Sequence, residues 1–126
     1  MTTKTKNIIY WILAGIVAFI FTGSAINKFI GGAEALEMAQ NVGLDATTYK
    51  IIGVVELLSV ILFLIPRTGI LGTLLLAAYM GGAIATHVEH DMLIIFPAAV
   101  EAFVWVVAVL RFPELRQRIL KEKPES

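Results

Sequence analysis

Residues 51–66 read IIGVVELLSVILFLIP, and this stretch decides the class of fold. Glu56 is its only charged residue, and almost all of the rest is apolar. A helix of about 20 largely apolar residues is long enough to cross the hydrocarbon core of a bilayer. Pro66 lacks a backbone N–H and cannot continue such a helix, and Arg67 follows at the expected water boundary. We therefore predict a membrane-spanning helix over residues 46–65.

Three more apolar segments of similar length occur, at residues 8–26, 68–86 and 92–110. Hydrophobic residues make up 58% of the chain, against roughly 45–50% in a typical soluble domain, and charged residues only 16%. The sequence therefore predicts an all-α fold, in which a four-helix transmembrane bundle forms one membrane domain over residues 1–126. Residues 111–126 are expected to form a charged cytoplasmic tail.

A short amphipathic pattern lies between the first two predicted spans. Apolar residues such as Ala33 and Leu36 are interleaved with acids such as Glu34. Gly43 is typical of a helix end, and Asp45 is typical of the N-cap of the next helix. We expect a short interfacial helix that lies at the membrane surface. An irregular loop is the alternative.

Lysine and arginine are distributed unevenly over the predicted connections. Eight of the ten lie in the two terminal tails and at Arg67, whereas only Lys28 and Lys50 lie on the opposite side. Because positively charged loops tend to stay in the cytoplasm, we expect a multi-pass protein of the cell (inner) membrane with both termini cytoplasmic. The first apolar segment is longer than a usual signal-peptide core, so we expect a retained helix. Cleavage near Ser24 is the alternative.

The composition argues against several classes of function. The net charge is zero and no basic patch carries interleaved aromatic residues, so nucleic acid is not an expected partner. The chain has no cysteine, which removes disulfides, thiolate metal sites and thiol–disulfide exchange by the chain itself. His87 and His90 do not have the spacing of a strong zinc pattern, and no glycine-rich phosphate loop is present. We therefore predict no metal site.

Two acids lie inside the predicted spans, Glu56 in the second and Glu101 in the fourth. A charged group in the bilayer core is costly, and such a group therefore indicates a functional site. At about 1.5 Å of helical rise per residue, both acids fall in the outer half of the membrane, at the level of Lys28 and His87. The sequence leaves two interpretations open: a polar pocket that opens to the outer face, or a buried ion-pair network that fixes helix register.

Two further residues belong to the candidate pocket. Ser24 lies one turn before Lys28 on the first span, and Met80 shares a neighbouring face with His87 on the third. Pro97 is expected to kink the fourth span and to widen the outer half of the bundle. The alternative is that proline is simply more common in membrane helices than in soluble ones.

Three motifs resemble those of a known family. Residues 23–29, GSAINKF, resemble the small-residue, Lys-Phe ending of the first helix in the DoxX-like family. Residues 53–57, GVVEL, resemble that family's G-x-x-E-L pattern. Residues 81–87 resemble the small-residue run and histidine that often end its third helix. The resemblance covers nearly the whole chain and implies a small four-helix membrane protein.

The resemblance implies less about activity than about fold. The family takes its name from a subunit associated with thiosulfate oxidation coupled to quinone reduction, and more distant animal relatives assist the assembly of receptor channels. Lys28, Glu56 and His87 match the family's motif positions, whereas Glu101 is inferred from the cost of a charge in the bilayer and from its depth. The absence of cysteine argues against sulfur chemistry by this chain itself.

The leading interpretation is a membrane component of a redox system that binds a small amphipathic molecule, such as a quinone or a lipid-like compound. Glu56 and Glu101 would accept hydrogen bonds or protons, and Lys28 or His87 would donate to the ligand. No cofactor motif is evident, and a quinone is the one candidate cofactor. Whether the chain is an enzyme is left open.

The alternative interpretation is a non-catalytic assembly factor, or a subunit of a membrane complex. The small residues Ala77, Gly81 and Ala85 would then dock a helix of a protein partner or of a second copy of the chain, and the acids would be structural. A transporter is less favoured, because four helices form a small bundle and no inverted repeat is evident.

Overall fold

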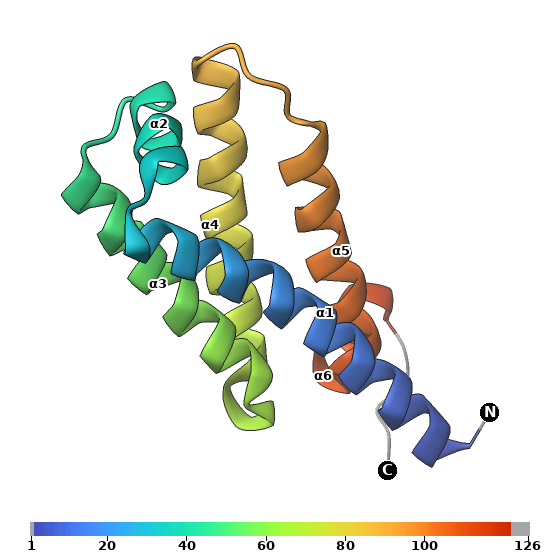
Figure 1. Ribbon diagram of the computed structural model, residues 1–126. Coiled ribbons are helices and arrows are strands. Elements are labelled where there is room, and N and C mark those ends of the chain that lie inside the picture. Colours follow the sequence, from blue (N-terminus) through green and yellow to red (C-terminus); the bar gives the residue numbers. More distant parts are fainter. Residues whose placement is uncertain (1, 122–126) are drawn as a thin grey trace.

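The computed structural model describes residues 2–121, and this part of the chain is helical with no strand (Figure 1). The prediction of an all-α fold is confirmed. The elements are α1 (Thr3–Ile30), α2 (Ala33–Asn41), α3 (Ala46–Leu64), the single 3-10 turn η1 (Pro66–Thr68), α4 (Gly69–Glu89), α5 (Ile95–Arg111) and α6 (Pro113–Leu120).

The prediction of four spans is confirmed only in part. Three described segments are long and apolar enough to cross a membrane, namely Thr3–Ile30, Ala46–Leu64 and Pro66–Glu89. The fourth predicted span corresponds to α5, which has 17 residues and is followed by α6 at a bend of 105°. It reaches the length of a span only if α5 and α6 are counted as one bent segment.

Several helix boundaries differ from the predicted ones, because hydropathy marks the apolar part of a helix and not its ends. The helix predicted at residues 8–26 extends over Thr3–Ile30, since the Thr2 hydroxyl oxygen accepts a hydrogen bond from the Thr5 N–H at 3.1 Å. The third span was predicted to end at residue 86, but α4 continues to Glu89.

Pro97 does not kink a helix, so that prediction is wrong. The fourth span was predicted to begin at residue 92, but α5 begins at Ile95. Pro97 is then the third helical residue, where the backbone N–H has no partner within the helix and its absence costs nothing. The residues before Ile95 belong to the α4–α5 connection, which includes Asp91 in the left-handed conformation with φ 56°.

The connection between α1 and α3 contains the predicted short helix, α2. The chain turns at Gly43, whose φ is +75°, a conformation that glycine adopts without steric cost. Asp45 is the N-cap of α3 as predicted, because its carboxylate accepts a hydrogen bond from the Thr48 N–H at 2.7 Å. The helical character of this segment is therefore confirmed.

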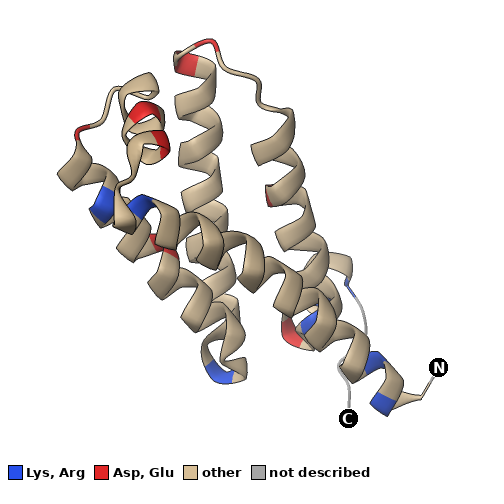
Figure 2. Cartoon of the chain, in the orientation of Figure 1, with Lys and Arg blue, Asp and Glu red and all other residues tan. Residues whose placement is uncertain are grey.

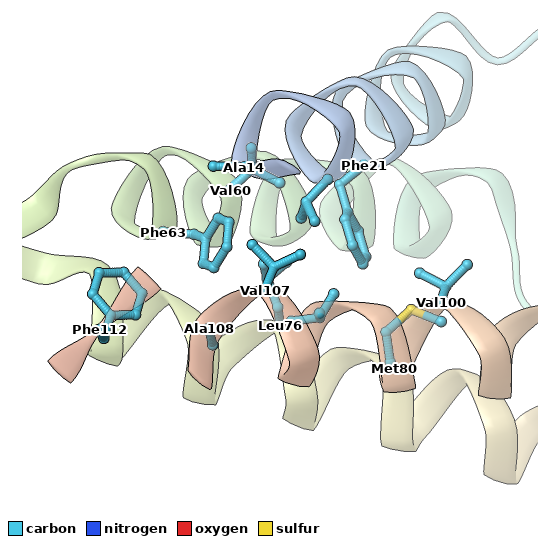
Figure 3. Close-up of a cluster of buried hydrophobic side chains, with 12 residues drawn as sticks. Ala14, Phe21, Val60, Phe63, Leu76, Met80, Val100, Val107, Ala108 and Phe112 are labelled. Carbon is cyan, nitrogen blue, oxygen red and sulfur yellow. The ribbon is translucent and has the colours of Figure 1, made fainter. Parts of the chain in front are cut away.

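The four long helices pack around one apolar core. Helix α1 contacts α3 and α5, and α4 contacts α3 and α5. Figure 3 shows the side chains of this core, among them Phe21 from α1, Phe63 from α3 and Leu76 from α4. Gly72 makes the α3–α4 contact close, since a Cβ atom there would overlap the backbone nitrogen of Phe63. The outward side chains are also apolar (Phe19 is 83% exposed), as expected for a surface that faces lipid.

Charged groups divide the molecule into two ends. Figure 2 shows the lysines and arginines concentrated at the end that holds the start of α1 and the α3–α4 turn, with acids at the opposite end on α2 and beyond α4. At the basic end, Arg111 of α5 donates hydrogen bonds of 2.7 Å to the carbonyl oxygens of Phe63 and Leu64. These bonds satisfy two carbonyls at the C-terminal end of α3, where Pro66 stops the helix.

Candidate functional site

Glu56 is the centre of the candidate site. It lies in the middle of α3, and only 1% of its surface is exposed. Three groups donate hydrogen bonds to its Oε1 atom: Lys28 Nζ at 2.9 Å, the Tyr79 hydroxyl at 3.2 Å and the Ser24 hydroxyl at 3.3 Å. A buried charge requires such partners, because its lost hydration must be replaced.

The sequence brings these donors together through helix spacing and one close helix contact. Ser24 and Lys28 are four residues apart on α1, so both side chains lie on one face of that helix. That face packs against α3 at Gly53, one turn before Glu56. A Cβ atom at Gly53 would lie 3.0 Å from both the carbonyl oxygen of Ala25 and the Cβ of Lys28. A larger residue would push α1, and with it Lys28, away from Glu56.

The ammonium group of Lys28 is enclosed on several sides. It donates to the Ser24 hydroxyl as well as to Glu56. It also lies 5.6 Å from the ring centroids of both Tyr49 and Tyr79, a distance at which cation–π attraction acts. The Lys28–Glu56 pair is therefore held by residues of α1, α3 and α4 together.

A cavity of about 820 Å³ opens beside this ion pair. Its walls come from α1, α2, α3, α4 and α5 and from the α2–α3 connection, and most of the side chains that line it are apolar, including Phe21, Ile52 and Val100. Polar groups line it at Asn27 and Thr86, besides those around Glu56. A volume in this range and an apolar wall with a few polar groups are typical of small-molecule sites.

Five of the six predicted site residues line this cavity: Ser24, Lys28, Glu56, Met80 and His87. Glu101, the sixth, does not. It is half-buried on α5, and within the described residues it forms no ion pair with Lys28 or His87. The structure therefore brings together the predicted residues of the first three spans and leaves the acid of the fourth outside the cavity.

One ring nitrogen of His87 is engaged in a hydrogen bond within α4, which leaves the other without a partner in the helix. Nδ1 lies 2.6 Å from the carbonyl oxygen of Ala83, one turn earlier on α4. A carbonyl oxygen can only accept, so Nδ1 carries a proton. In the neutral ring the other nitrogen, Nε2, is then an acceptor, and His87 lines the cavity.

The sequence interpretation missed the two tyrosines, Tyr49 and Tyr79. Tyr79 carries a hydroxyl in the middle of an apolar segment, and a buried hydroxyl needs a hydrogen-bond partner. This requirement could have indicated from the sequence alone that Tyr79 belongs to the site. Within the described residues, no group of three histidine, aspartate or glutamate side chains lies close enough together to hold a metal ion.

The long apolar helices, with a buried ion pair and a largely apolar cavity between them, define a small all-helical membrane protein. The chain belongs to the DoxX-like family, because the model of that family matches residues 12–110. The resemblance noted in the sequence is thereby confirmed, and the match includes Ser24, Lys28, Glu56, Met80 and His87. No curated protein and no solved structure matches the chain.

Proposed function

We propose that this protein binds a small amphipathic molecule, quinone-like or lipid-like, in the cavity beside Glu56, and that it serves as a membrane component of a redox system. The observation that supports binding most strongly is the combination of an apolar cavity of about 820 Å³ with a buried ion pair in its wall. A ligand with an apolar body and a polar group would match both features. The redox role rests on the family resemblance alone.

The proposed membrane arrangement follows from the charge distribution. Helices α1, α3, α4 and α5 would each cross the bilayer, and α2 would lie at its surface. The basic end, with both termini, would face the cytoplasm of a cell (inner) membrane. The cavity, which lies towards the opposite end of the bundle, would then be in the outer half.

Thermal unfolding of the purified protein with a panel of quinones and phospholipids tests the binding proposal. A ligand that binds the folded state stabilises it by about 2.7 kcal/mol at a concentration of 100 times Kd. Two neighbouring glycines of α4 provide a matched pair of variants. Gly82 lines the cavity and Gly81 does not, and a Cβ atom at either would meet no other atom within 4 Å.

We expect Gly82→Leu to narrow the cavity and to remove most of the ligand-dependent rise in Tm. Gly81→Leu should retain that rise, since its side chain points elsewhere on the same helix. A panel in which no compound raises Tm would argue against the proposal. So would an equal loss of the rise in both variants.

The second candidate function, an assembly factor or complex subunit, has one supporting observation. Gly81 and Ala85 are exposed on α4, which leaves a face of small residues that another helix could approach closely. Under this function Gly81→Leu would release a co-purifying partner or dissociate an oligomer, and Gly82→Leu would not. Size-exclusion chromatography with light scattering separates the two functions.

A further inference from the structure

The cavity beside Glu56 reaches the surface of the bundle between α1 and α5. Three of the residues that line it are exposed: Gly23 and Asn27 on α1, and Phe96, which is 73% exposed, on α5. Because exposed residues of both helices line the cavity, it is open to the outside between them. We call the part of the wall formed by Gly23, Asn27 and Phe96 the lateral opening.

The arrangement of the helices explains why the bundle is open at this place. Helices α1 and α5 contact each other, and Val17 of α1 and Val104 of α5 are completely buried in one apolar core. Figure 1 shows the two helices together near α6, whereas the end of α1 and the start of α5 lie far apart. The cavity occupies the space that this divergence leaves.

A second part of the wall is exposed on one helix only. Ala78 and Gly82, four residues apart on α4, line the cavity and are exposed. The lining residues of α3, namely Tyr49, Ile52 and Glu56, are buried or half-buried. A passage needs accessible residues on both of its sides, so the lateral opening between α1 and α5 is the passage that the exposed residues define.

The end of the cavity nearest α2 is covered. Met38 of α2 and Val42 and Leu44 of the following connection line this end with apolar side chains. The cover also contacts the end of α4, since a Cβ atom at Gly43 would lie 3.3 Å from Nε2 of His90. The route from the water beyond α2 is therefore obstructed by apolar side chains.

The lateral opening lies at the depth of lipid tails in the proposed membrane arrangement. Gly23 precedes Ile30, the last residue of α1, by seven residues, which places it about 10 Å from that end of the helix at 1.5 Å per residue. The hydrocarbon core of a bilayer is about 30 Å thick. Gly23 therefore lies within hydrocarbon when α1 spans the bilayer, and the exposed ring of Phe96 adds an apolar surface to the same opening.

We propose that the ligand enters this cavity from the bilayer through the lateral opening, and that it is a membrane-dissolved amphiphile whose hydrocarbon tail extends through the opening into the lipid. Exposing a tail to water costs free energy for every methylene group, whereas a tail that leaves between α1 and α5 stays in hydrocarbon. The polar group of the same molecule would remain inside, near the Lys28–Glu56 pair. This inference rests on the proposed function, because it specifies the ligand and the route for the same cavity.

Fluorescence of the full-length protein in nanodiscs of a phospholipid brominated at mid-chain tests whether a hydrocarbon chain reaches the cavity. Bromine quenches tryptophan at close approach, so Trp11 and Trp105 are first replaced with phenylalanine. Phe21→Trp then places a reporter in the cavity wall, at a residue that is only 2% exposed. Phe19→Trp, at a position that is 83% exposed, is the reference for direct contact with lipid. We expect the two reporters to lose fluorescence to a similar extent.

Two glycines of α1 provide matched variants of the opening. Gly15 and Gly23 are both exposed, and a Cβ atom at either would meet no other atom within 4 Å, but only Gly23 lines the cavity. Gly23→Phe should obstruct the opening and remove most of the quenching of Phe21→Trp, and Gly15→Phe should leave that quenching unchanged. Equal quenching in the two variants would overturn the lateral opening, and so would a Phe21→Trp reporter that bromine does not quench.

A pair of naphthoquinones, one with a decyl tail and one without a tail, tests the ligand class in the same nanodiscs. At equal mole fraction in the bilayer, both should raise the Tm of the wild-type protein, because the tail lies in hydrocarbon whether the ligand is bound or free. Gly23→Phe should remove the effect of the tailed compound only, and Gly15→Phe should retain both effects. A wild-type protein that binds only the tail-less compound would contradict the proposed ligand class.

The outcomes separate this inference from the proposed function. If Phe21→Trp is not quenched but a naphthoquinone raises Tm, the lateral opening is overturned while ligand binding stands. If Phe21→Trp is quenched but no compound raises Tm, the proposed function fails, whereas the lateral opening is supported without it. Should Phe21→Trp not fold, Ile52→Trp on α3, which lines the same cavity, takes its place as the reporter.

Discussion

Lys28 and Glu56 form an ion pair of 2.9 Å that joins the last turn of α1 to the middle of α3. Their side chains are only 11% and 2% exposed. Removing one partner of a buried pair leaves an uncompensated charge, whereas replacing both with apolar residues is often tolerated. The stability of the α1–α3 contact should therefore depend on both residues together.

The first prediction concerns this pairing. Lys28→Met should lower the free energy of unfolding by about 3 kcal/mol, because it leaves Glu56 buried and unpaired. The double variant Lys28→Met, Glu56→Leu should recover most of the loss. Denaturant titration in detergent measures both, with the exposed Lys50→Met as a control that should be close to neutral. Equal losses in Lys28→Met and Lys50→Met would contradict the ion pair as a source of stability.

A second prediction concerns two glycines of α4. Gly72→Ala should destabilise the protein by about 1–3 kcal/mol, because the added methyl group overlaps the backbone of α3 at Phe63. Gly81→Ala should be neutral or stabilising by up to about 1 kcal/mol, since nothing lies near its Cβ position and alanine favours the helix. Thermal unfolding of the two variants side by side measures the difference. The prediction is wrong if both substitutions have the same effect.

The third prediction concerns the C-terminal end of α3. Arg111→Gln should lower stability by about 1.5–3 kcal/mol, because the carbonyls of Phe63 and Leu64 lose charge-assisted donors. Tryptophan fluorescence should change as well, since the guanidinium lies 4.5 Å from the ring centroid of Trp11. The exposed Arg67→Gln serves as the control and should alter neither property. Unchanged fluorescence and stability in Arg111→Gln would show that Arg111 does not stabilise the C-terminal end of α3.

A fourth prediction concerns pH. The hydrogen bond from the Thr48 N–H holds the pKa of Asp45 below its usual range. A group with a lowered pKa contributes stability above its unfolded-state pKa, and this contribution is lost as the pH falls through the folded value. Stability should therefore decrease on acidification below about pH 4. Asp45→Asn, which caps helices without titrating, should remove this component of the acid dependence. An identical acid profile in the variant would exclude Asp45 as its source.

Much of the fold was predictable because a helix that crosses a lipid bilayer must be largely apolar over about 20 residues. Long apolar segments, Pro66 after α3 and Asp45 before it were sufficient to place the helices, since each acts through local backbone chemistry. The kink expected at Pro97 was wrong because its effect depends on where α5 begins. That boundary is a property of the α4–α5 connection, which hydropathy does not describe.

The sequence by itself determined that this is a helical membrane protein of the DoxX-like family with a costly acid, Glu56, in its second span. Only the tertiary structure decided which side chains donate hydrogen bonds to the buried carboxylate of Glu56 and balance its charge. Tyr79 joins the site and Glu101 does not, because the rotation of α4 and α5 about their axes depends on contacts between helices. Depth along a helix follows from counting residues, whereas the direction in which a side chain points follows from packing.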